Sequence, residues 1–99
     1  MEELKKYLEN NRKVEIEKLL PDNKIKRYRT AFYYEAKDEF QFFRPKENEE
    51  LINFDIDEVI RILVYTSDGV FAFKTKILHC GLKILKVTTP KSYQKVQKN

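Results

Sequence analysis

Apolar and polar residues alternate along most of the chain, which is the pattern of half-buried β-strands. The pattern is clearest over residues 25–36, where two faces separate. One face carries Tyr28, Thr30, Phe32, Tyr34 and Ala36, and the other carries Arg27, Arg29, Tyr33 and Glu35. We predict six strands, over about 13–19, 25–36, 39–44, 58–66, 70–80 and 82–88.

The first ten residues follow a different period. Leu4, Tyr7 and Leu8 fall at helical spacing, with acidic residues before them, and Asn10 and Asn11 end the pattern. The sequence therefore predicts a short amphipathic helix over residues 2–10. One or two helical turns are marginal alone, so this helix should dock on the sheet.

Turn residues separate the predicted strands. Asp68-Gly69 between two strand patterns is a strong hairpin signal, and Pro45 and Pro90 each end a strand because proline cannot donate to a ladder. The acidic segment 46–57 is predicted to be a loop that folds Leu51, Ile52 and Phe54 back onto the core. The strand over 58–66 is apolar on both faces, which places it at the centre of the sheet.

These elements predict a mostly β domain over residues 1–90. Six antiparallel strands with short connections and many aromatic side chains should curl into a small barrel or split barrel, with the helix beside it. The remaining residues, 91–99, form a basic polar tail that we expect to be loose.

The length and the charge of the chain narrow the class of protein. The chain has 99 residues, enough for one core. Residues 1–60 carry 12 Lys/Arg against 15 Asp/Glu, whereas residues 61–99 carry 8 Lys/Arg against the single Asp68, so a net −3 precedes a net +7. A basic second half fits contact with an acidic partner, including nucleic acid, and it equally fits lysines that only keep the surface solvated.

No set of residues suggests catalysis or metal binding. His79 and Cys80 are adjacent in a strand, so their side chains point to opposite faces and cannot act as a base and nucleophile pair. Zinc needs more His or Cys ligands than the chain has, and Asp55, Asp57 and Glu58 lack the glycine and spacing of a calcium loop. The sequence therefore predicts a protein that is not an enzyme and holds no cofactor or metal.

The compartment follows from what the sequence lacks. No apolar run approaches the about 20 residues of a membrane span, and the first ten residues do not form a signal peptide. The single Cys80 cannot make an internal disulfide. We predict a cytoplasmic protein with no membrane insertion.

One surface could bind single-stranded nucleic acid. Arg27, Arg29 and Tyr33 share the face directed away from the predicted core, and small β-barrels often stack bases on exposed rings. The alternative is that Tyr33 packs under the helix and that both arginines pair with nearby acids. The sequence leaves both interpretations open.

Several weak motifs in a fixed order resemble the N-terminal domain (PilZN) of the YcgR-like flagellar brake proteins. The resemblance spans residues 13–97. Its strongest part is a strand, a polar hairpin with Gly-Val and an aromatic residue, a Phe-x-Thr strand, a strand that ends near proline, and Val-Gln. The matching residues are Tyr28, Thr30, Phe42, Pro45, Tyr65, Gly69, Val70, Phe71, Phe73, Thr75, Pro90, Val96 and Gln97.

The resemblance implies a specific role. In such proteins the barrel precedes a PilZ domain that binds cyclic di-GMP, and an Arg-x-x-x-Arg segment between the two holds the nucleotide. Here Lys98 and Asn99 stand at the approach to that segment, so we expect the chain alone not to bind cyclic di-GMP well. It would be either the N-terminal part of a longer protein, which the basic tail favours, or a stand-alone relative.

The resulting hypothesis is a regulatory interaction module that controls motility. Its partners would be a C-terminal PilZ domain of the same protein and components of the flagellar motor, at the cytoplasmic base of the motor. Linker or partner contacts would come from Lys91, Lys95, Gln97 and Lys98. The alternatives are a stand-alone nucleic-acid-binding barrel that uses Arg27, Arg29 and Tyr33, and a barrel that self-associates through exposed strand edges.

Overall fold

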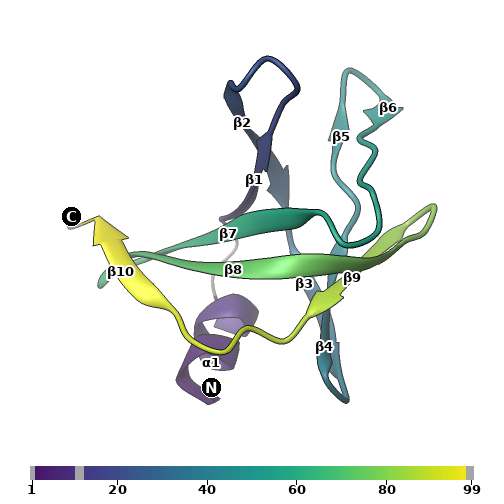
Figure 1. Ribbon diagram of the computed structural model, residues 1–99. Helices are drawn as coiled ribbons and strands as arrows, with labels where there is room; N and C mark the ends of the chain where they lie inside the picture. The colour runs from purple at the N-terminus through teal and green to yellow at the C-terminus, as the bar shows by residue number, and fades with distance from the viewer. Residues whose placement is uncertain (1, 11–12, 98–99) are drawn as a thin grey trace.

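The computed structural model describes residues 2–10 and 13–97, which form one helix and ten strands (Figure 1). The helix α1 spans Glu2–Asn10. The strands are β1 Val14–Leu19, β2 Ile25–Thr30, β3 Phe32–Ala36, β4 Glu39–Phe43, β5 Lys46–Glu47, β6 Glu50–Leu51, β7 Val59–Thr66, β8 Gly69–Cys80, β9 Ile84–Thr88 and β10 Gln94–Gln97.

Eight of these strands form one antiparallel sheet. Its order is β2-β1-β7-β8-β9-β4-β3, and β10 pairs with β8 beside this path. The two end strands, β2 and β3, are consecutive in the chain and are separated only by Ala31. The sheet therefore curls round so that one bent segment borders β1 with its first half and β4 with its second half. It is not a closed barrel, because no ladder joins β2 to β3.

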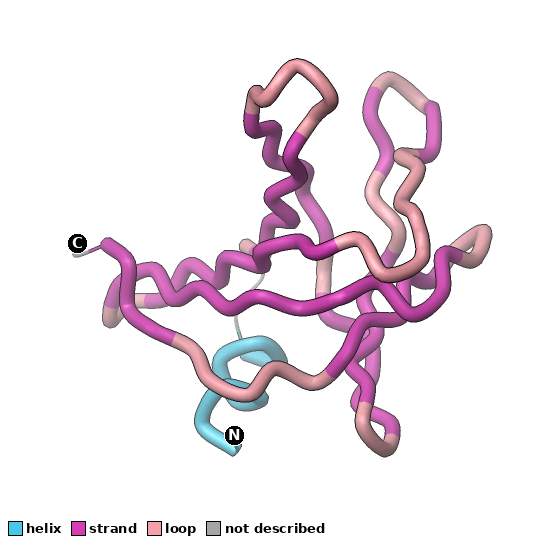
Figure 2. The backbone as a smooth tube through the Cα atoms, in the orientation of Figure 1, coloured by secondary structure: helices cyan, strands magenta, loops and turns pink. Residues whose placement is uncertain are grey.

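The predicted class is confirmed: the protein is mostly β and antiparallel with one short N-terminal helix (Figure 2). The strand number is higher than the six predicted, for three reasons. Ala31 divides the segment 25–36 into β2 and β3, the acidic loop contains the β5–β6 hairpin, and part of the predicted tail is β10.

The β7–β8 hairpin forms where Asp68-Gly69 predicts it. Thr66 pairs with Gly69, so Ser67 and Asp68 make the turn. Gly69 has a φ of 130°, which side-chain-bearing residues avoid. β7 lies between β1 and β8, which confirms its predicted central place.

One predicted face is wrong in β3. Tyr34 was expected to point inward with Phe32, but the register shifts between these residues, as in a β-bulge. Phe32 packs on the core, while Tyr33 and Tyr34 are exposed by 54% and 58%. The extra residue therefore places two consecutive tyrosines on the surface.

The main core lies inside the curl of the sheet and is closed by α1. Leu4 and Leu8 of the helix are buried, which confirms that the helix docks through its apolar face. Phe40 and Phe42 of β4 are fully buried there, as alternation predicts. Phe54 from the acidic loop also joins this core, while Ile52 packs against it.

The expectation of a loose tail is wrong for the residues that the structure describes beyond Pro90. Gln94 pairs with Ala72 and Lys95 pairs with Phe71, so β10 extends the sheet. The segment before it, residues 89–93, which we call the arch, is held through Tyr93. The Tyr93 hydroxyl donates a hydrogen bond to the Glu3 carboxylate of α1, and its ring meets Phe71 edge-on at 5.8 Å.

Arg44 fixes the loop after β4. Its guanidinium donates hydrogen bonds to the carbonyl oxygens of Ile52 (2.8 Å) and Gly81 (3.0 Å) and to Oδ1 of Asn53 (2.7 Å). A single side chain thus ties the acidic loop to the β8–β9 turn. No helix within residues 2–10 and 13–97 is long and apolar enough to cross a membrane.

Candidate binding surfaces

Four charged residues form a line across the outer face of the sheet. Arg27 of β2 lies opposite Glu17 of β1, Glu17 lies opposite Arg61 of β7, and Arg61 lies opposite Lys74 of β8. We call these four residues the charged row. It contains three cations and one carboxylate.

Both carboxylate oxygens of Glu17 accept hydrogen bonds from the two arginines. Its Oε2 accepts a hydrogen bond from Nε of Arg27 at 2.9 Å, and its Oε1 accepts one from Nε of Arg61 at 2.8 Å. The Glu17 side chain is only 10% exposed. Burial by itself raises the pKa of Glu17, but the hydrogen bonds and charges of Arg61 and Arg27 outweigh burial and hold that pKa below its ordinary value.

The predicted nucleic-acid residues are not brought into one free surface. Arg27 pairs with an acid, as one of the two sequence interpretations expected. Arg29 is exposed and lies opposite Glu15 in the β1–β2 ladder. The second interpretation also allowed Tyr33 to be buried under the helix, but more than half of Tyr33 is exposed.

Tyr33 instead belongs to an aromatic patch with Tyr34 and Phe43. The Tyr33 ring lies 5.2 Å from the Phe43 ring and 6.3 Å from the Tyr34 ring. Phe43 is 44% exposed. Rings of this kind can stack on bases or pack on a protein partner.

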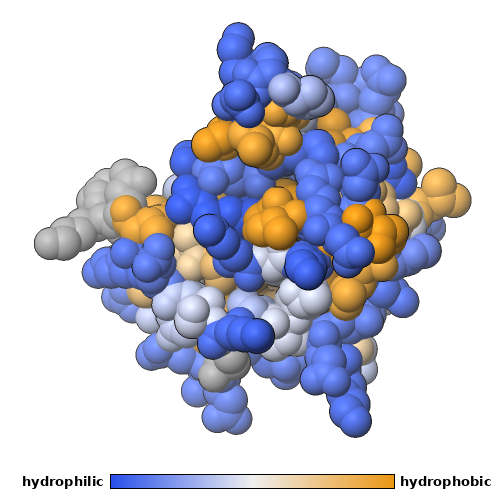
Figure 3. Space-filling model, in the orientation of Figure 1, coloured by the Kyte–Doolittle hydropathy of each residue, from blue (hydrophilic) through white to orange (hydrophobic). Residues whose placement is uncertain are grey.

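Other exposed apolar side chains are more scattered. Leu19 and Ile25 face each other at the tip of the β1–β2 hairpin, and Leu82 projects from the β8–β9 turn. On the face seen in Figure 3, apolar patches are separated by hydrophilic side chains. Such isolated residues are ordinary on a protein surface.

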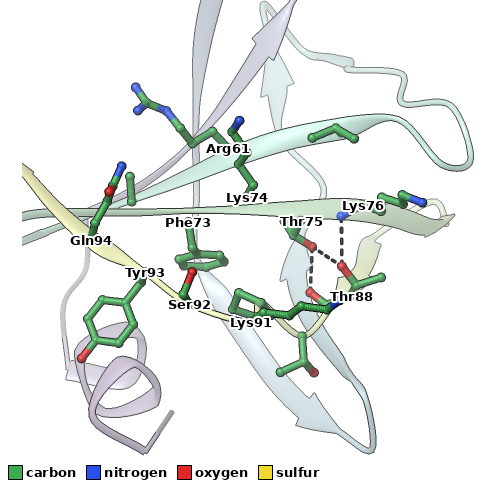
Figure 4. A pocket seen from close by; sticks show the side chains of 14 residues that line it. Arg61, Phe73, Lys74, Thr75, Lys76, Thr88, Lys91, Ser92, Tyr93 and Gln94 are labelled. Carbon is green, nitrogen blue, oxygen red and sulfur yellow. Dashed lines mark hydrogen bonds between the residues drawn. The ribbon is translucent and has the colours of Figure 1, made fainter.

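A groove lies where β8 changes its neighbour. On the edge of β8 away from β7, β10 pairs up to Ala72 and β9 pairs from Ile77, so on that edge residues 73–76 border the arch. The groove has a volume of about 660 Å³. Its lining comes from β7, β8, the end of β9, the arch and the start of β10 (Figure 4).

The groove is rich in cations. Arg61, Lys74, Lys76 and Lys91 line it, and no Asp or Glu does among the residues that the structure describes. We call it the basic groove. Its wall is fixed by threonines: the Thr75 hydroxyl donates to the Thr88 carbonyl oxygen at 2.7 Å, and the backbone N–H of Lys76 donates to Oγ1 of Thr88 at 3.0 Å.

The residues predicted as linker or partner contacts have separate positions. Lys91 lies in the arch and lines the basic groove. Lys95 is exposed on β10, and Gln97 is the last residue of that strand, opposite Val70. Lys98 lies outside the described residues. Their predicted role in a linker or in partner binding stays a prediction.

No cluster of three or more His, Cys, Asp or Glu residues that could hold a metal occurs within residues 2–10 and 13–97. His79 and Cys80 end β8, where the histidine is exposed and the thiol is half-buried. The sequence did not identify Arg61 as a functional residue. The only sign of it in the sequence was a cation within a strand that is otherwise apolar on both faces.

Comparisons with known proteins identify one solved structure with a similar fold. No protein-family model and no curated protein matches the chain. Among solved structures, the chain is similar to the Bacillus subtilis inhibitor of motility (MotI/DgrA), with a TM-score of 0.68 and 11% sequence identity. The similarity covers 91% of this chain and 47% of that one, so the chain spans about half the length of MotI/DgrA. The two share a fold over nearly all of this chain.

Proposed function

We propose that this chain is a regulatory interaction module of a protein that controls bacterial motility. The observation that carries the proposal is the likeness of its whole fold to about half of a protein named as an inhibitor of motility. The ordered motifs between residues 13 and 97, which resemble the N-terminal domain of flagellar brake proteins, support the same role independently of the fold.

In this proposal the module acts through its surface and performs no reaction. Two surfaces are suited to contact: the aromatic patch on β3 and β4, and the basic groove beside β8. Its partners would be a PilZ domain that follows it in the complete protein and components of the flagellar motor, in the cytoplasm. The pairing of β10 with β8 would give a following domain a defined starting direction.

Cyclic di-GMP is the proposed signal of the complete protein. The nucleotide would be held mainly by the PilZ domain and by an Arg-x-x-x-Arg segment, because arginine meets guanine edges and phosphates with two parallel hydrogen bonds. Binding there would change the angle between two rigid domains, as in a hinge switch. The present chain would supply one of those rigid bodies.

Calorimetry tests the ligand part of the proposal. The 99-residue chain should show no micromolar binding of cyclic di-GMP, whereas a fusion that appends an Arg-x-x-x-Arg segment and a PilZ domain after Asn99 should bind it. The matched control is the same fusion with both appended arginines changed to alanine. Micromolar binding by the 99-residue chain alone would contradict the proposed division of roles.

Swimming assays test the motility part. Expressed in a motile bacterium, the fusion should reduce the swimming radius in soft agar, and the arginine-free fusion should reduce it less. Equal radii for cells with and without the fusion, at matched protein levels, would argue against a role in motility.

The aromatic patch favours a second candidate function, which is the binding of single-stranded nucleic acid. Base stacking on an exposed ring contributes about 1–3 kcal/mol per base. Filter binding of single-stranded RNA at two salt concentrations would show affinity that falls steeply with salt, and that falls again in a Tyr33→Ala/Tyr34→Ala/Phe43→Ala variant. Absence of binding at low salt removes this alternative.

A further inference from the structure

We propose that the basic groove is a binding site for a compact polyphosphate group, meaning two or more linked phosphates on a small molecule. The inference stands on this groove alone and does not depend on the proposed role in motility. It begins with an imbalance of charge in the sheet.

The imbalance arises because Arg61 and Lys74 are directly opposite each other in the β7–β8 ladder. Like charges in facing positions of an antiparallel pair are destabilising. Glu17 offsets Arg61 from the β1 side, but both of its oxygens are already engaged by the two arginines. Lys74 therefore faces the groove without a carboxylate of the charged row to compensate it.

Two further lysines extend the same field. Lys76 follows Lys74 on the same face of β8, and Lys91 approaches from the arch. Among the described residues, no carboxylate lies within 4.0 Å of the amino group of Lys74, Lys76 or Lys91. Three lysines and one arginine thus line one groove, and an anion bound there would offset their positive charge.

The neighbouring polar groups suit phosphate. Thr89 and Ser92 of the arch also line the groove, so hydroxyl groups stand beside the cations as hydrogen-bond donors. Arg61 is already held by Glu17 and is 33% exposed, so its guanidinium is oriented before a ligand arrives. In Figure 4, Arg61 and Lys74 lie on one side of the β8 ribbon, and Lys91 and Ser92 come from the arch beside it.

The size and charge of the groove favour a small, highly charged ligand. A volume of about 660 Å³ lies within the range of small-molecule sites. Four cations match the four or five negative charges of a linked triphosphate better than the isolated single charges of phosphodiesters. Cyclic di-GMP and RNA, which carry only diester phosphates, should therefore bind this groove weakly.

The test is a calorimetric titration of the 99-residue chain with sodium tripolyphosphate in about 20 mM salt, where screening is weak. We expect binding, and we expect the variant Lys74→Gln/Lys76→Gln/Lys91→Gln to weaken it by more than about tenfold, because it removes three of the four cations. The matched control is Lys37→Gln/Lys46→Gln/Lys83→Gln. These three lysines are exposed and do not line the groove, and their substitution removes the same net charge.

The possible outcomes separate cleanly. A selective loss in the groove variant, with amide shifts in NMR spectra confined to residues 73–76 and 88–92, supports the site. No binding by the unmodified chain, or an equal loss in both triple variants, overturns it. Binding of RNA or cyclic di-GMP in the groove more tightly than tripolyphosphate also overturns it, whereas failure with tripolyphosphate leaves the proposed motility role untouched.

Discussion

Two basic regions of this protein meet at Arg61, and they differ in whether their cations have a carboxylate partner. In the first, Arg27 and Arg61 share Glu17, so their charges support the packing of β1 against its neighbours. In the second, Lys74, Lys76 and Lys91 face a groove that has no acid in its described lining. Whether a cation is available to a ligand therefore depends on its partner across the strand, and a count of lysines and arginines does not reveal it.

The largest expected effect follows from removing the carboxylate that separates the two regions. Glu17→Gln removes the carboxylate that pairs with both guanidinium groups and should lower the free energy of unfolding by about 1–2 kcal/mol, because Glu17 is nearly buried although Arg27 is half exposed. Urea denaturation measures this loss. Glu50→Gln, at an exposed acid of β6, is the control and should change stability by less than about 0.5 kcal/mol.

Glu17→Gln should also change ligand binding. Without Glu17, Arg61 belongs electrostatically to the basic groove, so tripolyphosphate should bind Glu17→Gln more tightly than the unmodified chain. Weaker binding by this variant, in protein shown to be folded by circular dichroism, would mean that Arg61 must be oriented by Glu17 to contribute.

The contribution of Glu17 should depend on pH in one direction. Its pKa in the folded protein lies below the ordinary value of 4.5, so its stabilising contribution is fully present above about pH 4.5 and is lost as the pH falls through the folded-state pKa. Urea midpoints from pH 7 to pH 3 should therefore converge for the unmodified chain and Glu17→Gln below pH 4.5. A gap that stays constant down to pH 3 would show that the carboxylate charge is not what stabilises the sheet.

A pair of single substitutions separates the two regions directly. Lys74→Gln should weaken tripolyphosphate binding by about fivefold, or about 1 kcal/mol, with little change in stability. Arg27→Gln should lower stability and change binding by less than about twofold, because its charge is already paired with Glu17. Equal effects of both substitutions on calorimetric affinity would mean that only net charge matters.

Sequence patterns could predict the elements that depend on near neighbours. Alternation identified the buried Phe40 and Phe42, and Asp68-Gly69 marked the hairpin. The segment 25–36 pairs with its two neighbours in the chain, β1 and β4. The bend at Ala31 arises because β1 continues the sheet through β7 and β4 continues it through β9, and these long-range pairings are not visible in the local pattern. β10 was missed for the same reason, since its strand signal is weak and its partner is supplied by β8.

The binding surfaces were predictable to a smaller extent. Alternation placed Lys74 and Lys76 outward, and the basic tail drew attention to Lys91. The sequence allowed Arg27 to pair with a nearby acid, but it could not show that Glu17 also bonds Arg61, which is 44 residues away. The register of the strands, which the hydrophobic pattern and the turns set, decides which of the basic residues remain uncompensated.

The smallest expected effect concerns the arch that forms one wall of the groove. Tyr93→Phe removes the hydrogen bond to Glu3 at an exposed site, so we expect little loss of stability at pH 7 and a modest fall in tripolyphosphate affinity, of about twofold, as the arch loosens.

The hydrogen bond to Glu3, together with burial and the charge of Glu3, raises the pKa of Tyr93 to about 12. A raised folded-state pKa means that the stabilising contribution is complete below the ordinary value of 10.0 and is lost as the pH rises towards 12. The stability difference between the unmodified chain and Tyr93→Phe should therefore disappear over that interval in alkaline urea titrations. A difference that stays unchanged up to pH 12 would show that the hydroxyl does not stabilise the arch through its bond to Glu3. The absence of a difference at every pH would show that the ring contact with Phe71, which phenylalanine preserves, holds the arch.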